Sequence, residues 1–237
     1  MEPLLSFNQV SKTIGNKKIL KDMTFNIPTG KIIAFLGQNG AGKTTSLKIA
    51  SGLMDIDSGE VQFLGKPIDK SKKDVMFIPD YPFLYDELTG EEYIRFTAEL
   101  FKIRVNKAII GEKVKYFDLQ NEVGKKIKNL SLGNKKKLTL LTTLLNNPKL
   151  LLLDEFISGI DPINMKKTKT ILRNYVNEGN SILLSTHQLE VAQNFCESLI
   201  FINNGEVLQS NIDVAAVTNK DNSLEDYFIR TLSEGVN

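Results

Sequence analysis

The feature that most constrains this chain is a glycine-rich loop that follows a short apolar run. Residues 32–36, Ile-Ile-Ala-Phe-Leu, have the length and composition of a strand buried on both faces. The next residues fit the pattern G-x-x-x-x-G-K-[ST] at every fixed position. They are Gly37, Gln38, Asn39, Gly40, Ala41, Gly42, Lys43 and Thr44, with Thr45 following. Residues 43–51 then have helical character and end at Gly52. Strand, loop and helix together predict a phosphate-binding site.

The chemistry of phosphate groups explains this spacing. Glycines let the backbone turn so that consecutive N–H groups point at one anion, and the helix N-terminus adds positive potential. We expect Lys43 to reach the β- and γ-phosphates of a nucleotide and the Thr44 hydroxyl to take one coordination position of Mg²⁺. The alternative is a glycine-rich turn that carries Lys-Thr by chance, and the flanking strand and helix argue against it.

Two acids follow a second apolar run. Residues 150–153 are all leucine, and Asp154 and Glu155 come directly after them. In an open α/β sheet ligands bind at the carboxyl ends of the strands. We expect Asp154 to hold Mg²⁺, directly or through water, and Glu155 to orient or deprotonate an attacking water. Acids after a strand also occur in ordinary solvated loops and helix caps, but their pairing with a phosphate loop favours the functional interpretation.

The remaining pattern predicts an α/β fold. Residues 4–10, 19–20 and 25–27 indicate antiparallel strands, and residues 79–146 are mostly helical. Within them residues 89–92 have the spacing of a capping box, followed by an apolar stripe. Strands alternating with helices in the second half indicate a parallel sheet with right-handed crossovers. The predicted architecture is a parallel-sheet core with an N-terminal antiparallel β subdomain and an inserted α-helical subdomain. We expect one domain over residues 1–237, with the helical subdomain at about 80–146 and a C-terminal tail at about 211–237.

These motifs together resemble the nucleotide-binding subunit of an ABC transporter, over nearly all of residues 4–210. Residues 158–161, Ser-Gly-Ile-Asp, match the D-loop of that family, and His187 matches its switch histidine. Residues 130–134, Leu-Ser-Leu-Gly-Asn, lie where the LSGGQ signature belongs. The resemblance implies a P-loop NTPase fold, with ATP and Mg²⁺ as ligands and with Glu155 and His187 as catalytic residues.

The resemblance also implies partners. Two such subunits face each other head to tail, as a homodimer or as a pair of different ATPase subunits. Ser131 and Gly133 then bind the γ-phosphate held by the partner, and Ser131 is equally typical of a helix N-cap, which is compatible. A separate multi-span membrane subunit is expected, with this chain in the cytoplasm on the inner face of the cell membrane. Residues 223–228 resemble tails of bacterial export-type members, while the cargo and the direction of transport stay open.

Five positions depart from the family pattern. Asp80 replaces the Q-loop glutamine, although a carboxylate can still bind Mg²⁺. Leu132 and Asn134 replace a glycine and the glutamine of the signature, Ile14 stands where an aromatic side chain stacks on adenine, and Phe156 replaces a proline after the catalytic acid. Turnover rate and base preference are the properties that these changes affect.

Composition limits the other function classes. The net charge is +2, and no stretch of the sequence is as densely basic as nucleic-acid binding requires. The densest basic stretch is Lys135, Lys136 and Lys137, which we interpret as a solvated helix face. The longest apolar stretches, 138–145 and 150–153, fall far short of the ~20 residues that span a bilayer. We therefore expect no nucleic-acid partner and membrane work only through another subunit.

Two other functions are compatible with parts of this pattern. ABC-type proteins that act on ribosomes or DNA usually carry two such domains or a long coiled coil, and the interval between Lys43 and Asp154 contains no sustained heptads. A catalytically idle partner in an asymmetric pair is the second rival. The intact Lys43, Asp154, Glu155 and His187 argue against it, and the altered signature keeps it open.

Overall fold

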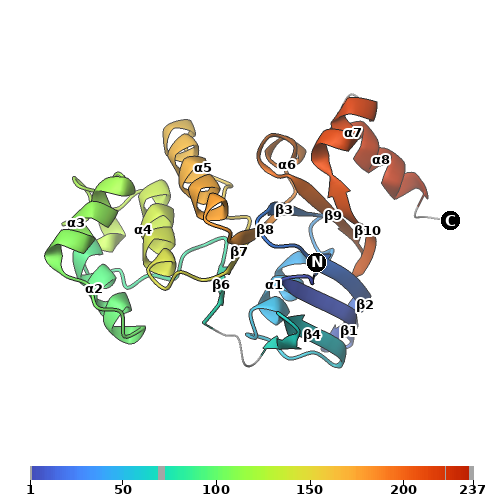
Figure 1. Ribbon diagram of the computed structural model, residues 1–237, viewed down its shortest axis with the longest axis horizontal. Helices are drawn as coiled ribbons and strands as arrows, with labels where there is room; N and C mark the ends of the chain where they lie inside the picture. Colours follow the sequence, from blue (N-terminus) through green and yellow to red (C-terminus); the bar gives the residue numbers. More distant parts are fainter. Residues whose placement is uncertain (1, 69–72, 222, 235–237) are drawn as a thin grey trace.

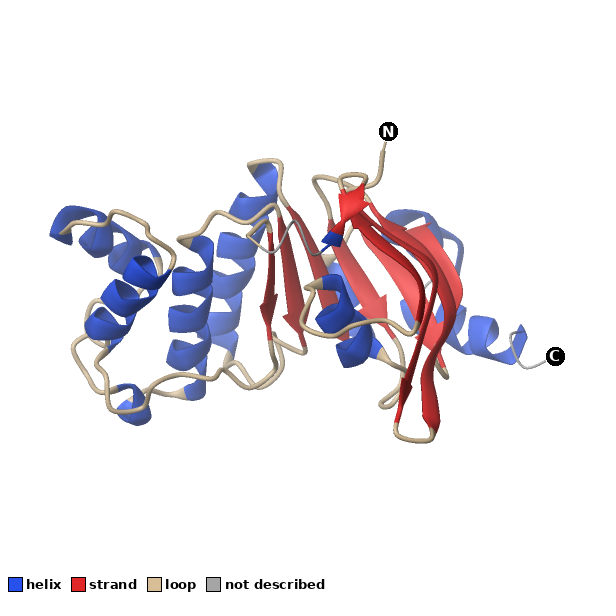
Figure 2. Ribbon diagram, turned by 90° about the horizontal axis from the view of Figure 1, so that it is seen from below, coloured by secondary structure: helices blue, strands red, loops and turns tan. Residues whose placement is uncertain are grey.

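The computed structural model describes residues 2–68, 73–221 and 223–234, and contains two β-sheets (Figure 1, Figure 2). One sheet has the order β2-β1-β4-β5 and is antiparallel, and the other has the order β10-β9-β3-β8-β7-β6. In the second sheet all pairs are parallel except β10 with β9. The strands are β1 (Leu5–Ile14), β2 (Lys17–Ile27), β3 (Ile32–Leu36), β4 (Ser58–Phe63), β5 (Lys66–Pro67), β6 (Val75–Ile78), β7 (Leu150–Asp154), β8 (Ser181–Thr186), β9 (Ser198–Asn203) and β10 (Glu206–Asp213).

The helices between β6 and β7 form one end of the molecule, and the last two helices lie at the other end (Figure 1). The helix after β3 lies between the two sheets, and the helix after β7 and the first helix after β8 pack on the parallel sheet. The helices are α1 (Lys43–Ala50), α2 (Gly90–Leu100), α3 (Lys107–Tyr116), the short 3₁₀ helix η2 (Ile127–Asn129), α4 (Leu132–Leu144), α5 (Pro162–Asn177), α6 (Leu189–Phe195), α7 (Val214–Asp221) and α8 (Leu224–Glu234).

The parallel sheet separates two hydrophobic clusters, which explains its continuous apolar strands. In β7, Leu151 and Leu153 pack with the helices on one face. Leu150 and Leu152 pack with α1 and the antiparallel sheet on the other face. Because successive side chains of a strand point to opposite faces, a strand covered on both sides needs apolar residues at every position.

The predicted fold class is confirmed. The N-terminal antiparallel sheet, the parallel core and the helices inserted between β6 and β7 are all present. The predicted capping box at the start of α2 is also confirmed, since Thr89 accepts from the backbone of Glu92 while the Glu92 carboxylate accepts from the Thr89 backbone.

Two strands near the C-terminus were not predicted. β9 is buried beside β3, and β10 pairs with it antiparallel at the sheet edge, so the tail that we placed from about 211 begins inside β10. Helix α8 then packs back on the sheet, with Tyr227 and Phe228 against Phe201. In the part of the chain that the structure describes, no helix is both long and apolar enough to cross a membrane.

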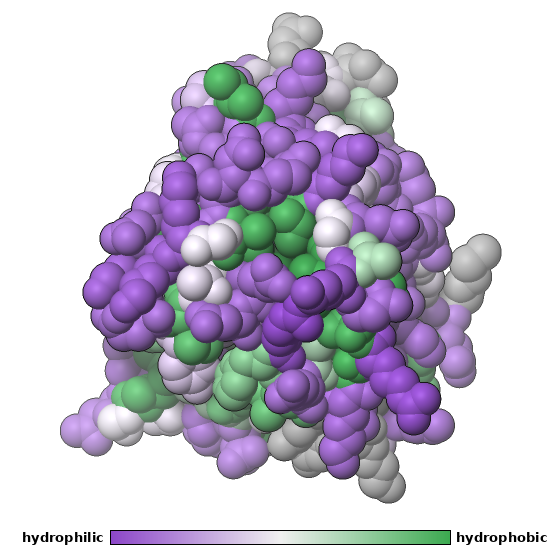
Figure 3. All heavy atoms as spheres, turned by 90° about the vertical axis from the view of Figure 1, so that its left-hand side faces the viewer, coloured by the Kyte–Doolittle hydropathy of each residue, from purple (hydrophilic) through white to green (hydrophobic). Residues whose placement is uncertain are grey.

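The helical end of the molecule faces the viewer in Figure 3. Apolar side chains are visible there between hydrophilic ones, and some of them lie in hollows of the surface. This end carries α2, α3 and α4 (Figure 1).

Candidate active site

The site lies at the carboxyl ends of four adjacent strands. β3, β8, β7 and β6 are neighbours in the sheet, with Leu36 level with Thr186 and Asp154 level with Ser185. The glycine-rich loop follows β3, His187 follows β8, Glu155 follows β7 and Asp80 follows β6. Parallel strands thus bring together, at one edge, residues that the sequence separates by more than a hundred positions.

The glycine-rich loop has the backbone that its glycines allow. Gly42, the N-cap of α1, has φ 104°, a conformation that L side chains rarely adopt. A side chain at Gly37 would overlap the backbone oxygen of Ile202 at 2.5 Å. The Lys43 ammonium lies inside the loop, 2.7 Å from the carbonyl oxygen of Gly37 and 3.2 Å from that of Gln38. Asn39, Gly40, Gly42, Lys43, Thr44 and Thr45 line one cleft with Asp154 and Glu155.

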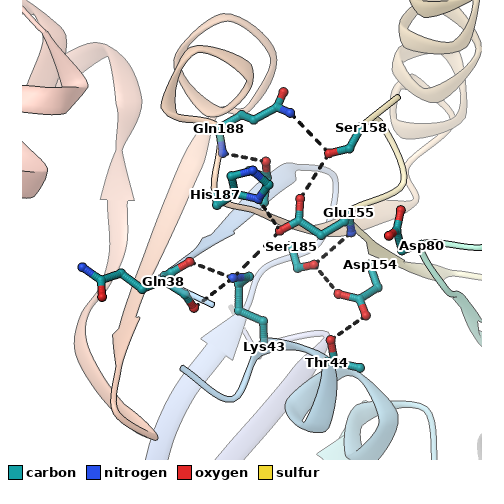
Figure 4. A network of polar contacts seen from close by, with 12 residues as sticks. Gln38, Lys43, Thr44, Asp80, Asp154, Glu155, Ser158, Ser185, His187 and Gln188 are labelled. Carbon is teal, nitrogen blue, oxygen red and sulfur yellow. Dashed lines mark hydrogen bonds and ion pairs between the residues drawn. The ribbon is translucent and has the colours of Figure 1, made fainter. Parts of the chain in front are cut away.

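Asp154 is held by hydroxyl groups on both carboxylate oxygens (Figure 4). Thr44 Oγ1 donates to Oδ2 at 2.7 Å, and Ser185 Oγ donates to Oδ1 at 2.5 Å. Ser185 Oγ also accepts from the backbone N–H of Glu155 at 3.1 Å. The carboxylate is therefore oriented between the loop helix and β8 before any ligand contacts it.

Glu155 occupies the centre of the network. Its Oε1 lies 3.0 Å from Nδ1 of His187 and 3.9 Å from Nζ of Lys43. Its Oε2 accepts from Ser158 Oγ at 3.2 Å, and Gln188 reaches that hydroxyl at 3.4 Å. Glu155 also has φ 45°, in the left-handed region, which costs an L residue about 1–3 kcal/mol and persists only where surrounding contacts impose it.

The lysine run behaves differently from our expectation. We interpreted residues 135–137 as a solvated helix face, and this is wrong for Lys136 and Lys137, whose side chains are buried. Lys136 Nζ donates to the carbonyl oxygens of Phe156 at 2.9 Å and Ser158 at 2.8 Å, and lies 3.4 Å from Asp80 Oδ1. Each buried ammonium has backbone carbonyls to accept its hydrogen bonds, which is what permits its burial.

Ser131 and Gly133 belong to the N-terminus of α4. Ser131 is the N-cap, with its Oγ accepting from the Asn134 backbone at 3.3 Å, so the capping role that we considered is confirmed. Gly133 is buried, and a side chain there would meet Asn164 and Asp161 at 3.2 and 3.3 Å. Asp161 itself caps α5.

The region where the family resemblance predicts contact with the base is aliphatic. Ile14, where the family has an aromatic residue, is 48% exposed at the end of β1 and pairs with Lys17 across the hairpin. Lys17 and Ile19 line the same cleft as the phosphate loop. Phe156, at the position of a family proline, is fully buried.

Charge and burial oppose each other at Lys43. Burial lowers the pKa of its ammonium, and the carboxylates of Glu155 and Asp154 raise it in opposition. Burial likewise lowers the pKa of Lys136, with the Asp80 carboxylate opposing it. A cation that is short of solvent and near carboxylates gains much from an incoming polyphosphate.

Comparison with known proteins agrees with this geometry. A family model described as "ABC transporter" matches residues 20–158. The chain belongs to the ABC transporter ATP-binding family. As a member of that family it binds ATP and hydrolyses it to power transport.

Relatives and solved structures in this family cover most of the chain. The bacitracin transport ATP-binding protein BcrA of Bacillus licheniformis is 31% identical over 214 residues, which are 88% of this chain and 70% of BcrA. The lantibiotic transport ATP-binding protein SrtF of Streptococcus pyogenes is 32% identical over 208 residues, 86% of this chain and 89% of SrtF. A solved structure described as an ATP-binding subunit of an ABC transporter has a TM-score of 0.84 and 27% identity, and covers 97% of this chain and 99% of its own.

Ser185, Gln188 and Lys136 belong to the network, and no motif in the sequence identifies them. A serine at the end of an apolar strand carries no motif of its own, and neither does a glutamine after the histidine. Lys136 is part of a charge run. Its position one turn into α4, on the side that faces the core, is the signal that separates it from Lys135.

Proposed function

We propose that this ABC transporter ATPase hydrolyses ATP with Glu155 as the general base and His187 as its partner on the γ-phosphate side. The observation that carries the proposal is the contact of one Glu155 oxygen with both His187 and Lys43. A carboxylate placed between the phosphate-loop lysine and a histidine is within reach of a water that attacks the γ-phosphate. His187 orients this carboxylate and can also donate to a γ-phosphate oxygen.

The residues present fit a magnesium ion. Thr44 Oγ1 and Asp154 Oδ2 are hard oxygen ligands that lie 2.7 Å apart at the mouth of the phosphate loop. One hydroxyl and one carboxylate suffice for Mg²⁺, since it uses few carboxylates and completes its shell with water and phosphate. Thr44 and Asp154 would hold it, and Asp80 would reach it through water. When bound, Mg²⁺ neutralises charge that develops on the β- and γ-phosphates.

The chain acts as one half of a pair. Two copies, or this chain and a related ATPase subunit, enclose ATP between one phosphate loop and the α4 N-terminus of the other. Ser131 and Leu132 are exposed at that N-terminus, where backbone N–H groups and the helix dipole favour an anion. Hydrolysis removes the γ-phosphate that bridges the pair, and the clamp opens.

A membrane subunit docks on an aromatic surface beside Asp80. Phe83 is 85% exposed, and Tyr81, Tyr85 and Phe96 are exposed with it. Tyr85 and Phe96 are in edge-to-face contact at 5.3 Å. Phe96 and Leu100, which belong to the apolar stripe after the capping box, are both exposed. Exposed aromatic rings next to a catalytic loop indicate a partner surface.

We infer that the chain acts in the cytoplasm, on the inner face of the membrane, and the exposed aromatic surface supports docking there. The partner is a separate multi-span subunit, and motion of the loop that carries Asp80 connects it to ATP. The relatives named for bacitracin and lantibiotic transport support a transport system of this kind.

The substitution Glu155→Gln tests the mechanism. The amide keeps the shape of the side chain and loses the ability to accept a proton, so hydrolysis should fall by roughly 10²–10⁴ while ATP still binds. Size-exclusion chromatography with ATP and Mg²⁺ should then show a stable dimer. Glu206→Gln, at a surface ion pair with Lys21, is the matched control and should behave as the unmodified protein. A Glu155→Gln protein that stays monomeric and hydrolyses ATP normally would remove Glu155 from this role.

A further inference from the structure

Lys136 is a buried cation that the mechanism above does not use. Its side chain is 1% exposed, and its ammonium ends among the carbonyl oxygens of Phe156 and Ser158 and the Asp80 carboxylate. The ring of Phe156 lies under it, with its centroid at 5.6 Å. Three different segments therefore meet at one atom: helix α4, the turn after β7, and the loop after β6.

The two carbonyls belong to the turn that carries Glu155. Phe156 follows Glu155 directly, and Ser158 donates from its hydroxyl to Glu155 Oε2 at 3.2 Å. The backbone N–H of Ser158 also donates to the Glu155 carbonyl at 3.0 Å. By fixing the Phe156 and Ser158 carbonyls, Lys136 therefore fixes the turn whose Ser158 hydroxyl orients the Glu155 side chain.

The backbone of Glu155 needs such support. At φ 45° an L residue is in a sparsely populated region, and it stays there only if surrounding contacts impose the conformation. On the strand side, Ser185 accepts from the Glu155 N–H through its hydroxyl and its carbonyl. Lys136 supplies hydrogen bonds on the other side of the residue.

We propose that Lys136 is a positioning residue for hydrolysis, which holds the Phe156–Ser158 turn against α4 so that the Glu155 carboxylate faces the γ-phosphate, with Asp80 as its counter-ion. The inference rests on the proposed role of Glu155. This pairing also explains why an aspartate, and not the glutamine of the family, stands at position 80. An acid forms an ion pair with the buried ammonium of Lys136, whereas a glutamine would supply only a dipole.

Lys136→Met is the decisive substitution, since methionine fills a similar unbranched volume without charge or donor. We expect kcat to fall by about tenfold to a hundredfold, the effect of a misplacement of order 1 Å in a catalytic group. The KM for ATP and the ATP affinity by calorimetry should stay within about threefold, because Lys136 does not line the nucleotide cleft. Lys136→Arg, which keeps two N–H donors, should recover most of kcat.

The neighbouring lysine supplies a matched control. Lys137 is in the same helix and equally buried, but its ammonium donates to the carbonyl of Asp118 at 3.0 Å, which lies in the loop after α3. Lys137→Met should therefore lower thermal stability as Lys136→Met does, and leave kcat within about twofold. A loss of kcat common to both variants would mean that Lys136 is only structural.

Combination with Glu155→Gln separates this inference from the mechanism beneath it. If Lys136 acts through Glu155, adding Lys136→Met to Glu155→Gln should not lower the residual rate further. If Lys136→Met hydrolyses ATP at the normal rate while Glu155→Gln is impaired, only the positioning role of Lys136 is overturned. If Glu155→Gln itself hydrolyses ATP at the normal rate, the role of Glu155 as general base is overturned. Should Lys136→Met fail to fold, Lys136→Gln carries the same test, because its side chain is uncharged and one bond shorter, and an unchanged kcat would refute the proposal.

Discussion

Ser185→Ala probes how firmly the site is built before ATP arrives. The hydroxyl of Ser185 is fully buried, donates to the Asp154 carboxylate and accepts from the Glu155 backbone. Alanine removes one hydrogen bond to a charged group, about 1.5–3 kcal/mol, and one neutral bond, about 1 kcal/mol. We expect the free energy of unfolding to fall by about 2–4 kcal/mol. The Asp154 carboxylate keeps only its bond from Thr44 and can rotate away from the phosphate loop.

The functional consequence appears in the magnesium dependence. Groups that orient a metal ligand typically contribute 10–100-fold to metal affinity or activity. The Mg²⁺ concentration for half-maximal ATPase should therefore rise about 10–100-fold in Ser185→Ala, while ATP affinity without Mg²⁺ changes little. Urea unfolding without nucleotide measures the stability change, and a Mg²⁺ titration of the ATPase rate measures the rest.

Ser181→Ala, at the opposite end of β8, is the control. Ser181 is just as buried, and its hydroxyl donates to the Pro28 carbonyl and accepts from the Gly30 backbone, both far from the site. It should lose about 1–3 kcal/mol of stability and keep the normal Mg²⁺ dependence. Equal Mg²⁺ dependence in Ser185→Ala and the unmodified protein would refute the idea that Asp154 must be held by β8.

Two further predictions concern the departures from the family pattern. An aliphatic Ile14 should give comparable binding of ATP and GTP by calorimetry, because an aromatic stack is worth ~1–3 kcal/mol per base and an aliphatic contact less. An ATP preference above about a hundredfold, roughly 2.7 kcal/mol, would show that another residue reads adenine. Leu132, 37% exposed at the α4 N-terminus, should weaken the pairing of two subunits. The ATPase rate per subunit should therefore rise with protein concentration. The Leu132→Gly protein should reach its maximal rate per subunit at a lower protein concentration. Rapid turnover independent of concentration would show that Leu132 is harmless.

Much of the fold was predictable because its signals are local. The strand before the phosphate loop and the four leucines before Asp154 have no alternation, and such runs belong to strands covered on both faces. The capping box at Thr89 was predictable for the same reason, since cap chemistry needs only residues three positions apart. Adjacent strands then brought Lys43, Asp154 and His187 to one edge.

What could not be predicted depends on long-range contacts. Strand β9 is apolar along nearly its whole length, as a buried helix segment can also be, and only its place beside β3 decides between the two. Lys136 and Lys137 follow Lys135 in sequence, yet the carbonyls that accept their hydrogen bonds come from the turn after β7 and the loop after α3. A charge run is solvated by default, and no local pattern identifies acceptors that are distant in the chain. The left-handed Glu155 is likewise imposed by Ser185 and the turn around it.

Helix α4 carries both the proposed contact with the partner's nucleotide, at Ser131, and the proposed positioning residue Lys136. Ser131 caps its N-terminus, which faces the partner's nucleotide in the proposed pair, and Lys136 lies about one and a half turns further along, roughly 7.5 Å along the axis. A helical segment of this length moves as a rigid unit, so a shift of the N-terminus toward a γ-phosphate carries Lys136 with it. Under the two proposals, this shift would be passed to the carbonyls of Phe156 and Ser158, which accept hydrogen bonds from Lys136, and through Ser158 to the carboxylate of Glu155. Closure on one ATP would thus adjust the base that hydrolyses the other, because a single helix contacts both.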